Sequence, residues 1–246
     1  MYQYNDDSLM LHNDLYQINM AESYWNDGIH ERIAVFDLYF RKMPFNSGYA
    51  VFNGLKRVVN FIENFGFTNE DITYLKSIGY KEDFLNYLKD LKFTGNIKSM
   101  QEGEICFGNE PLLRVEAPLI QAQLIETILL NIINFQTLIA TKASRIRQIA
   151  THDSLMEFGT RRAQEIDAAL WGARAAFIGG FDSTSNVRAG KLFNIPVSGT
   201  HAHALVQTYG DEYIAFKKYA ERHKNCVFLV DTFHTLKSGV PTAIKV

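Results

Sequence analysis

Residues 154–203 have the sequence SLMEFGTRRAQEIDAALWGARAAFIGGFDSTSNVRAGKLFNIPVSGTHAH. Short apolar segments alternate here with longer segments of helical composition, a pattern typical of parallel βα repeats. The predicted strands are SLMEFG, AAFIGG, PVSGT and, at 226–231, CVFLVD. Their carboxyl ends fall near Phe158, Gly180, Gly199 and Val230. This spacing predicts right-handed βα units of a barrel.

The sequence before this repeat mixes helices and strands. Strands are predicted at 33–40, 96–100, 104–108 and 112–117, and helices at 12–27, 50–65 and 71–91. We therefore predict an α+β domain over residues 1–117 and a barrel domain over 118–246, which begins with a long helix at 119–150. The predicted fold class is α/β, with the N-terminal α+β domain followed by the first half of an irregular parallel βα barrel. Four βα units do not close a barrel, so we expect the chain to stop in mid-barrel.

The composition is that of an ordinary globular protein. Of the 246 residues, 47% are hydrophobic and 21% charged, and the formal net charge is −2. This balance gives no electrostatic reason to expect nucleic acid or an anionic membrane as a partner. Cys106 and Cys226 stand alone in apolar runs, so we expect packing residues and neither a zinc site nor a disulfide.

Two segments bear on location. The most apolar segment, 124–140, is interrupted by polar residues, which favours a buried helix over a membrane span. The N-terminus MYQYNDDSLM is acidic where a signal peptide needs a basic start. We therefore expect a cytoplasmic protein that does not contact the membrane.

Groups with chemical potential follow each predicted strand. The carboxyl ends of parallel strands converge on one face of a barrel, where functional groups gather. The strings at these ends are FGTRR (158–162), GGFDS (179–183), SGTHAH (198–203) and DTFH (231–234). Each residue also has a structural interpretation: Phe158 in the core, Arg161 at a helix start, Asp182 and Asp231 as N-caps, and the histidines as surface or packing residues.

Several strings together resemble the nicotinate phosphoribosyltransferase family, in that family's order. They are NDLYQINMA (13–21), FDLYFRKMPF (36–45), EFGTRRAQ (157–164), IGGFDSTSNV (178–187), PVSGTHAHALVQ (196–207) and VDTFHTLKSGVP (230–241). The resemblance covers essentially the whole chain, and its most specific part is Gly-Thr-x-Ala-His at 199–203. It implies an enzyme of NAD salvage that joins nicotinate to phosphoribosyl pyrophosphate, with ATP hydrolysis through a phosphohistidine, in a homodimer with shared active sites.

The resemblance also implies which residues bind nicotinate. Phe158 and Tyr16 of a partner subunit match the two aromatic residues that sandwich the pyridine ring. Thr200 and Asp182 match positions near the bound acid. Arg161 is suited to pair with the nicotinate carboxylate, because a guanidinium can form two parallel hydrogen bonds to it.

The remaining implied roles concern phosphate chemistry. His203 matches the histidine that takes a phosphoryl group from ATP, a task for which imidazole is a suitable nucleophile. Arg41 matches a residue that reaches the pyrophosphate across the dimer. Asp231 is assigned to the ribose or to a Mg²⁺ ion. His234 stands where many relatives have a small or acidic residue, and its role and that of His201 are left open.

Two other functions compete with this one. His201-Ala202-His203 has the spacing of a two-histidine metal site, as in a metal-dependent barrel hydrolase, but the predicted strand ends before the pair and a helix follows. The second alternative is an inactive fragment or regulatory paralogue that binds nicotinate. On physical grounds the residues do not choose among nicotinate, nicotinamide and quinolinate, and only the resemblance favours nicotinate.

Overall fold

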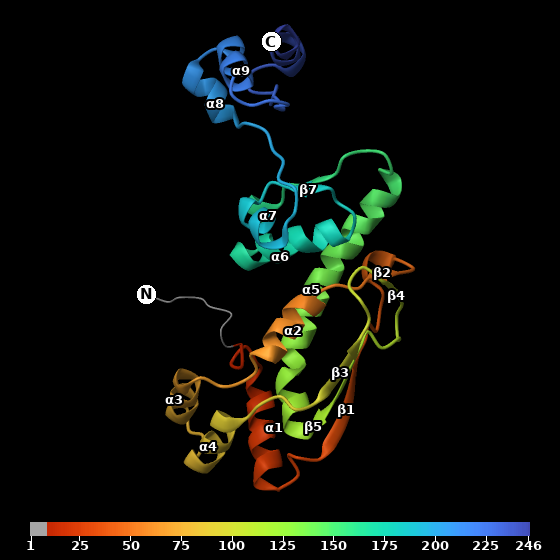
Figure 1. Ribbon diagram of the computed structural model, residues 1–246, viewed down its shortest axis with the longest axis vertical. Coiled ribbons are helices and arrows are strands. Elements are labelled where there is room, and N and C mark those ends of the chain that lie inside the picture. Colours follow the sequence, from red (N-terminus) through yellow and green to blue (C-terminus); the bar gives the residue numbers. More distant parts are fainter. Residues whose placement is uncertain (1–8) are drawn as a thin grey trace.

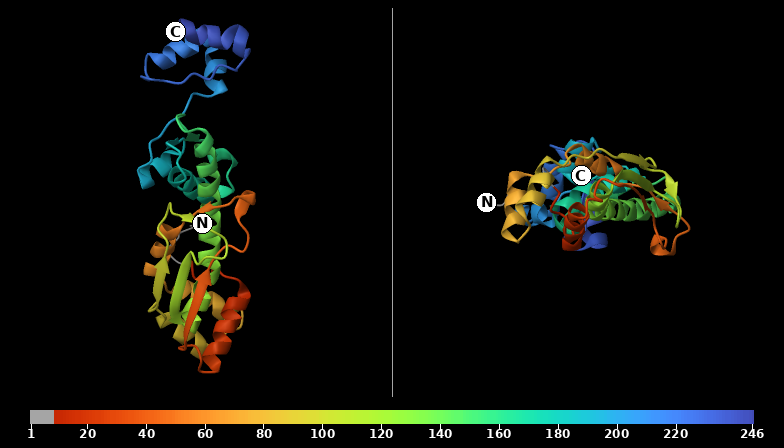
Figure 2. Two further views of the ribbon diagram at one scale, coloured as in Figure 1. Left: turned by 90° about the vertical axis from the view of Figure 1, so that its right-hand side faces the viewer. Right: turned by 90° about the horizontal axis from the view of Figure 1, so that it is seen from below.

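The computed structural model describes residues 9–246, so most of the acidic N-terminal stretch used above lies outside the described residues. The chain is elongated (Figures 1 and 2). An N-terminal α+β unit is followed by helix α5 (Leu119–Ile149), a middle unit of residues 150–198, and a C-terminal unit of residues 201–246 made of short helices. Helix α5 runs through both the N-terminal and the middle unit (Figure 1).

The N-terminal unit confirms the predicted α+β mixture. Its strands β1 (Ile33–Leu38), β5 (Leu113–Pro118) and β3 (Asn96–Ser99) form an antiparallel sheet in that order, and β2 (Ala50–Val51) pairs with β4 (Ile105–Cys106). Its helices are α1 (Leu15–Asn26), α2 (Leu55–Glu63), α3 (Asn69–Ser77) and α4 (Glu82–Asp90), with a short turn η1 (Pro44–Asn46). Buried and exposed residues alternate along the first five positions of β5, as expected for a strand with one face on the core. The helix predicted at 71–91 is two helices, because Gly79 adopts a φ of 108° between them.

Helix α5 is the central element of the fold. Its 31 residues span roughly 46 Å at the standard helical rise. It packs against α1, α2, β1, β2 and β5 of the N-terminal unit and against α6 of the middle unit. Among the described residues it is also the one helix long and apolar enough to cross a membrane by length and composition. Because most residues from Ile120 to Ala143 are buried by these neighbours, α5 is a core helix of the structure.

Buried hydroxyl groups on α5 hold the segment around β2. The Val51 N–H donates to Thr141 Oγ1 at 2.9 Å, and the Asn53 N–H donates to Thr137 Oγ1 at 3.1 Å. The Thr137 hydroxyl in turn donates to the Asn53 carbonyl at 3.1 Å. Buried backbone groups need hydrogen-bond partners. In a sheet a neighbouring strand provides them, and here the threonine hydroxyls of α5 do so.

The middle unit contains the start of a parallel βα repeat. Strands β6 (Met156–Glu157) and β7 (Ser183–Thr184) pair in parallel, and Val197 forms a parallel bridge to Thr184. A short turn η2 (Thr160–Arg162) and helices α6 (Glu165–Ile178) and α7 (Val187–Phe193) connect them. This is the βαβ order that the sequence predicts, in a small sheet that does not close.

Two of the predicted strands are wrong. The segment AAFIGG begins as the last turn of α6, because its small side chains let that helix pack closely on α5; a Cβ at Gly179 would lie 2.4 Å from the Ala140 carbonyl oxygen. The segment at 226–231 is not a strand either. It is covered by the C-terminal helices α8 (His203–Tyr209) and α9 (Glu212–Ala220), where the Phe228 ring stacks on Phe216 at 4.8 Å.

The rest of the C-terminal unit is helical. Helices α8 and α9 are separated at Gly210, whose φ is 69°. A π-helical turn η3 (Thr235–Gly239) and helix α10 (Val240–Lys245) follow and pack on each other, and α10 also packs on α9.

An ion pair joins the N-terminal unit to α6. Glu102 and Arg174 approach to 2.6 Å, with side chains only 16% and 12% exposed. The Glu102 carboxyl also accepts the backbone N–H groups of Gly54 and Lys56 at the start of α2. Burial alone raises the pKa of Glu102, but the hydrogen bonds and charge of Arg174, together with these two N–H groups, bring the pKa below its usual value.

This pair predicts a specific dependence of stability on pH. Because the folded-state pKa of Glu102 is lowered, its contribution is present above the unfolded pKa and is lost as the pH falls through the folded pKa. Glu102→Gln should therefore cost about 3 kcal/mol of unfolding free energy at pH 7, and the difference from wild type should shrink below the ordinary carboxyl pKa. Urea unfolding across this pH range measures both.

The control is Asp37→Asn, which breaks an exposed pair with Arg114 in the N-terminal sheet. Exposed pairs contribute little, so this variant should be much closer to wild type at pH 7. An Asp37→Asn loss as large as that of Glu102→Gln, or a Glu102→Gln difference that stays constant down to low pH, would contradict the assignment.

Candidate functional site

The carboxyl edge of the parallel sheet carries several of the residues predicted to bind ligand. Phe158 follows β6 and the residue is 41% exposed. The next turn, η2, presents the exposed Arg161. Ser198 and Thr200 follow the Val197 bridge, and Ser198 Oγ lies 3.1 Å from Met156 Sδ on β6. The structure therefore places Phe158, Arg161 and Thr200 beyond the same edge of this sheet.

Asp182 lies at the opposite edge, which corrects the predicted placement. The strand is β7, so Asp182 precedes it instead of following a strand at 175–180. Its carboxyl accepts the Leu155 N–H at 2.7 Å and Arg147 Nη2 at 2.5 Å. These two hydrogen bonds, that of Leu155 first, lower the pKa of Asp182. Asp182 is therefore held by α5 and the loop before β6, and it does not cap a helix.

The polar residues at the carboxyl end of β7 are Ser185 and Asn186, which the sequence interpretation missed. The Asn186 N–H donates to Thr184 Oγ1 at 3.0 Å, and Asn186 Oδ1 caps α7 by accepting the Ala189 N–H at 3.0 Å. An asparagine directly before the helical run VRAGKLF is a typical N-cap signal. An N-cap at Asn186 predicts that the preceding strand ends near residue 184, as β7 does.

His203 and Asp231 lie together in the C-terminal unit. His203 is the first residue of α8, and its Nε2 is 4.0 Å from Asp231 Oδ1. The two side chains are 51% and 62% exposed. His203 Nδ1 lies 3.3 Å from Thr232 Oγ1, so one ring nitrogen has a hydroxyl neighbour and the other faces the carboxyl group and solvent. This arrangement suits an accessible nucleophile.

His201 and His234 have structural surroundings. The buried His201 ring packs against Phe216, Tyr219 and Phe228. Its Nε2 accepts the Leu229 N–H at 3.2 Å, so Nδ1 carries the proton and faces the Ala202 carbonyl. His234 accepts the Lys237 N–H at the start of η3. Because both ring nitrogens of His201 face backbone groups and its ring is buried while that of His203 is exposed, the pair lacks the geometry of a two-histidine metal site.

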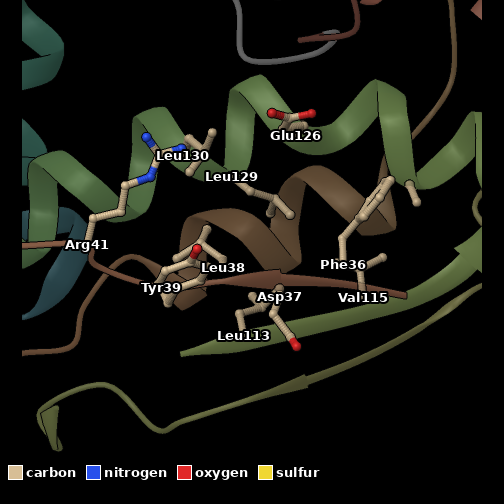
Figure 3. Close-up of a pocket in the computed structure, with 11 residues that line it drawn as sticks. Phe36, Asp37, Leu38, Tyr39, Arg41, Leu113, Val115, Glu126, Leu129 and Leu130 are labelled. Atoms are coloured by element: carbon tan, nitrogen blue, oxygen red, sulfur yellow. The ribbon is translucent and has the colours of Figure 1, made fainter. Parts of the chain in front are cut away.

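Tyr16 and Arg41 belong to a separate part of the surface. They line a cavity of about 420 Å³ beside α5, together with Glu126. A neighbouring cavity of about 510 Å³ lies between α5 and the β1–β5 sheet, with Arg41 at one end (Figure 3). Among residues 9–246, no carboxylate forms an ion pair with Arg41, so its guanidinium is available to an anion.

Helix α5 separates these two groups of residues within one chain. The cavity with Tyr16 meets α5 at residues 126–134, whereas strands β6 and β7 are tied to it at Arg147. Thirteen to 21 helical residues correspond to roughly 20–30 Å. In Figure 1, α1 and β7 accordingly lie far apart along the molecule. A single chain does not bring Tyr16 and Phe158 to the same small ligand.

The described residues offer few metal ligands. Within 9–246, no three His, Cys, Asp or Glu side chains lie close enough together to hold a metal ion. Mg²⁺ is usually bound by one or two carboxylates together with water and substrate phosphates. The exposed Asp231 fits that mode of binding, because one carboxylate is enough when water and the substrate phosphates supply the remaining Mg²⁺ ligands.

Sequence comparisons identify one group of relatives. Residues 11–134 match the family model described as the nicotinate phosphoribosyltransferase (NAPRTase) N-terminal domain. A nicotinate phosphoribosyltransferase of Bacillus subtilis (strain 168) is 67% identical over 246 residues, which is all of this chain and 50% of the relative. One from Dictyostelium discoideum is 40% identical over 95% of this chain and 47% of the relative. The chain spans about half the length of these curated relatives.

Solved structures agree with the sequence matches. The human nicotinic acid phosphoribosyltransferase superposes with a TM-score of 0.85 at 31% identity, over 94% of this chain and 56% of the human one. A nicotinate-nucleotide pyrophosphorylase from Pyrococcus furiosus has a TM-score of 0.82 at 24% identity, over 100% of this chain and 56% of its own, and shares the fold.

The two histidines of the C-terminal unit should respond differently to substitution. His201→Ala leaves a cavity and an unpaired Leu229 N–H, so it should lower the local unfolding free energy of residues 203–230 by about 2–4 kcal/mol. His203→Ala, at an exposed position, should change it by less than about 0.5 kcal/mol. Amide hydrogen exchange of this unit measures both values. Equal losses in the two variants would show that His201 is not the packing residue.

Proposed function

Because the chain belongs to the nicotinate phosphoribosyltransferase family, we propose that its protein forms nicotinate mononucleotide from nicotinate and phosphoribosyl pyrophosphate in NAD salvage. The observation that carries this proposal is the exposed His203 beside Asp231, within a Gly-Thr-x-Ala-His string, in a chain 67% identical throughout to the Bacillus enzyme. Such salvage takes place in the cytoplasm, where we place the protein.

We assign nicotinate to the carboxyl edge of the parallel sheet. The exposed ring of Phe158 offers a flat apolar surface to the pyridine ring. We assign Arg161, on the adjacent turn, to the nicotinate carboxylate, and Thr200 lies beyond the neighbouring strand. Asp182 lies at the other edge, so any role it has in binding acts through the loops that it holds.

The transfer reaction requires charge stabilisation more than covalent help from the protein. The pyridine nitrogen forms a bond to the anomeric carbon while the bond to pyrophosphate breaks, through an oxocarbenium-like state. Arg41 carries a guanidinium without a carboxylate partner among the described residues, and we assign it to the pyrophosphate. Asp231, with the substrate phosphates, would hold a Mg²⁺ ion, which neutralises phosphate charge when bound.

His203 is the proposed acceptor of a phosphoryl group from ATP. The Thr232 hydroxyl beside Nδ1 orients the ring, which leaves Nε2 to attack the terminal phosphorus as ADP departs. Water then cleaves the phosphohistidine and releases phosphate. This hydrolysis would pull an unfavourable equilibrium toward nicotinate mononucleotide, which explains why ATP is consumed although the sugar phosphate is already activated.

The proposed enzyme is a homodimer with shared sites. Tyr16 and Arg41 lie too far along α5 from Phe158 to meet the same nicotinate within one chain. The surface around their cavities exposes Val35, Tyr39 and Leu130, apolar residues that a second subunit would cover. We therefore propose that one subunit supplies Tyr16 and Arg41 to the site built on the partner's strand ends.

Labelling with ATP tests the role of His203. The full-length native protein, incubated with ATP radiolabelled at the terminal phosphate, should acquire an acid-labile label, and His203→Ala should lose it. His234→Ala is the matched control, because this exposed histidine of the same unit already serves as a cap and should leave labelling intact. Labelling of His203→Ala at the wild-type level would refute the assignment.

A further inference from the structure

The carboxyl group of Glu157, immediately before Phe158, accepts hydrogen bonds from two loops. Its Oε1 accepts the N–H of Gly159, and its Oε2 accepts the Thr184 hydroxyl at 2.8 Å. The Thr184 oxygen also accepts the Asn186 N–H at 3.0 Å. One carboxyl group thereby connects the turn after β6 to the turn after β7.

The Glu157 side chain lies on the face of the sheet that is covered by α7. Glu157 pairs with Thr184 and Thr184 with Val197, so their side chains share one face of the sheet. Val197 packs against α7, where a Cβ at Gly190 would lie 2.3 Å from Val197 Cγ2, and Thr184 is fully buried. Phe158 is the next residue along the chain, and alternation directs its ring to the opposite face.

The position of Gly159 depends on this carboxyl group. A Cβ at Gly159 would lie 2.6 Å from Glu157 Oε1, so a larger residue at this position would require the end of the Glu157 side chain to shift away from the hydrogen bond. The Gly159 carbonyl accepts the N–H groups of Arg162 and Ala163 at 2.8 and 2.9 Å. The same residue therefore starts the turn η2 that carries Arg161.

We propose that Glu157 is a positioning residue for the pyridine site. Its carboxyl group, on the helix-covered face, fixes the Phe158–Gly159 turn and, through Thr184, the neighbouring strand end. The Phe158 ring and the Arg161 guanidinium are thus held ready for nicotinate before it binds. This inference rests on the proposed function, in which Phe158 and Arg161 bind nicotinate.

Steady-state kinetics of the full-length native protein test the proposal. Glu157→Gln keeps the size of the side chain but replaces one acceptor oxygen by an NH₂ group. This donor then faces another donor, either the Gly159 N–H or the Thr184 hydroxyl, so one of the two hydrogen bonds is lost. The KM for nicotinate should rise by at least about tenfold, since a lost charge-assisted hydrogen bond loosens the turn. The KM for phosphoribosyl pyrophosphate and kcat should change by less than about twofold, because the Glu157 contacts lie on the nicotinate loops.

Thr184 provides a second, independent variant. Thr184→Val removes the hydroxyl and should reproduce the selective rise in nicotinate KM, whereas Thr184→Ser, which keeps the hydroxyl, should restore most of the wild-type value. Glu221→Gln, at an exposed site on the C-terminal unit, is the matched control and should leave every parameter unchanged. Melting temperatures identify any variant that loses activity by unfolding.

A double-mutant cycle separates this inference from the proposed function. If Glu157 acts through Phe158 and Arg161, Glu157→Gln combined with Phe158→Ala should raise the nicotinate KM by less than the product of the two single effects. A nicotinate KM that rises in Phe158→Ala but is unchanged in both Glu157→Gln and Thr184→Val would overturn the positioning role alone. An unchanged nicotinate KM in Phe158→Ala would instead overturn the assignment of the pyridine site.

Discussion

The rigid length of helix α5 is the constraint on which the arrangement of the molecule depends. The hydroxyls of Thr137 and Thr141 hold the segment around β2 on the helix, and Arg147 at its far end donates to Gly180 and Asp182 in the loop before β7. An α-helix does not shorten or bend easily without a proline or a bulge. The cavity with Tyr16 and Arg41, which meets α5 at residues 126–134, and the parallel strands, which are tied to it at Arg147, are therefore kept roughly 20–30 Å apart along one rod, so one chain does not bring residues from both places to the same site.

The sequence predicted those elements whose residues carry strong local signals. Helix α5 was expected at 119–150 and extends over Leu119–Ile149, because Pro118 precedes a long run of good helix formers. The strands β1, β3 and β5 likewise lie where β-forming residues predicted them. The segments at 175–180 and 226–231 were predicted wrongly, because a short apolar run fits a buried helix, a strand or a packed loop equally well. The first segment is helical because it packs on α5, and the second is a loop that packs on α8 and α9. These are contacts with distant parts of the chain, which the local sequence does not show.

The candidate site was predictable where its residues form a specific string and unpredictable where it depends on packing. His203 was chosen over His201 by the motif alone, and the structure places them in opposite surroundings, one exposed beside Asp231 and one buried among aromatic rings. Asp182 was placed at the wrong edge because the apolar run before it set the predicted strand end at Gly180, four residues before the observed end at Thr184. The contacts of Glu157 depend on which residue of β7 pairs with it. That pairing joins two segments far apart in the chain, so the sequence around Glu157 alone does not predict it.

The most direct test of the shared site uses two inactive subunits of the full-length protein, one carrying Tyr16→Ala and the other His203→Ala. In their heterodimer, one site combines the intact strand ends of the first chain with the intact Tyr16 of the second, while the other site carries both defects. Purified heterodimers should therefore recover about half of the wild-type rate of nicotinate mononucleotide formation, as expected for one of two equivalent sites. Heterodimers no more active than the two parent homodimers would contradict the claim that α5 divides the site between two chains.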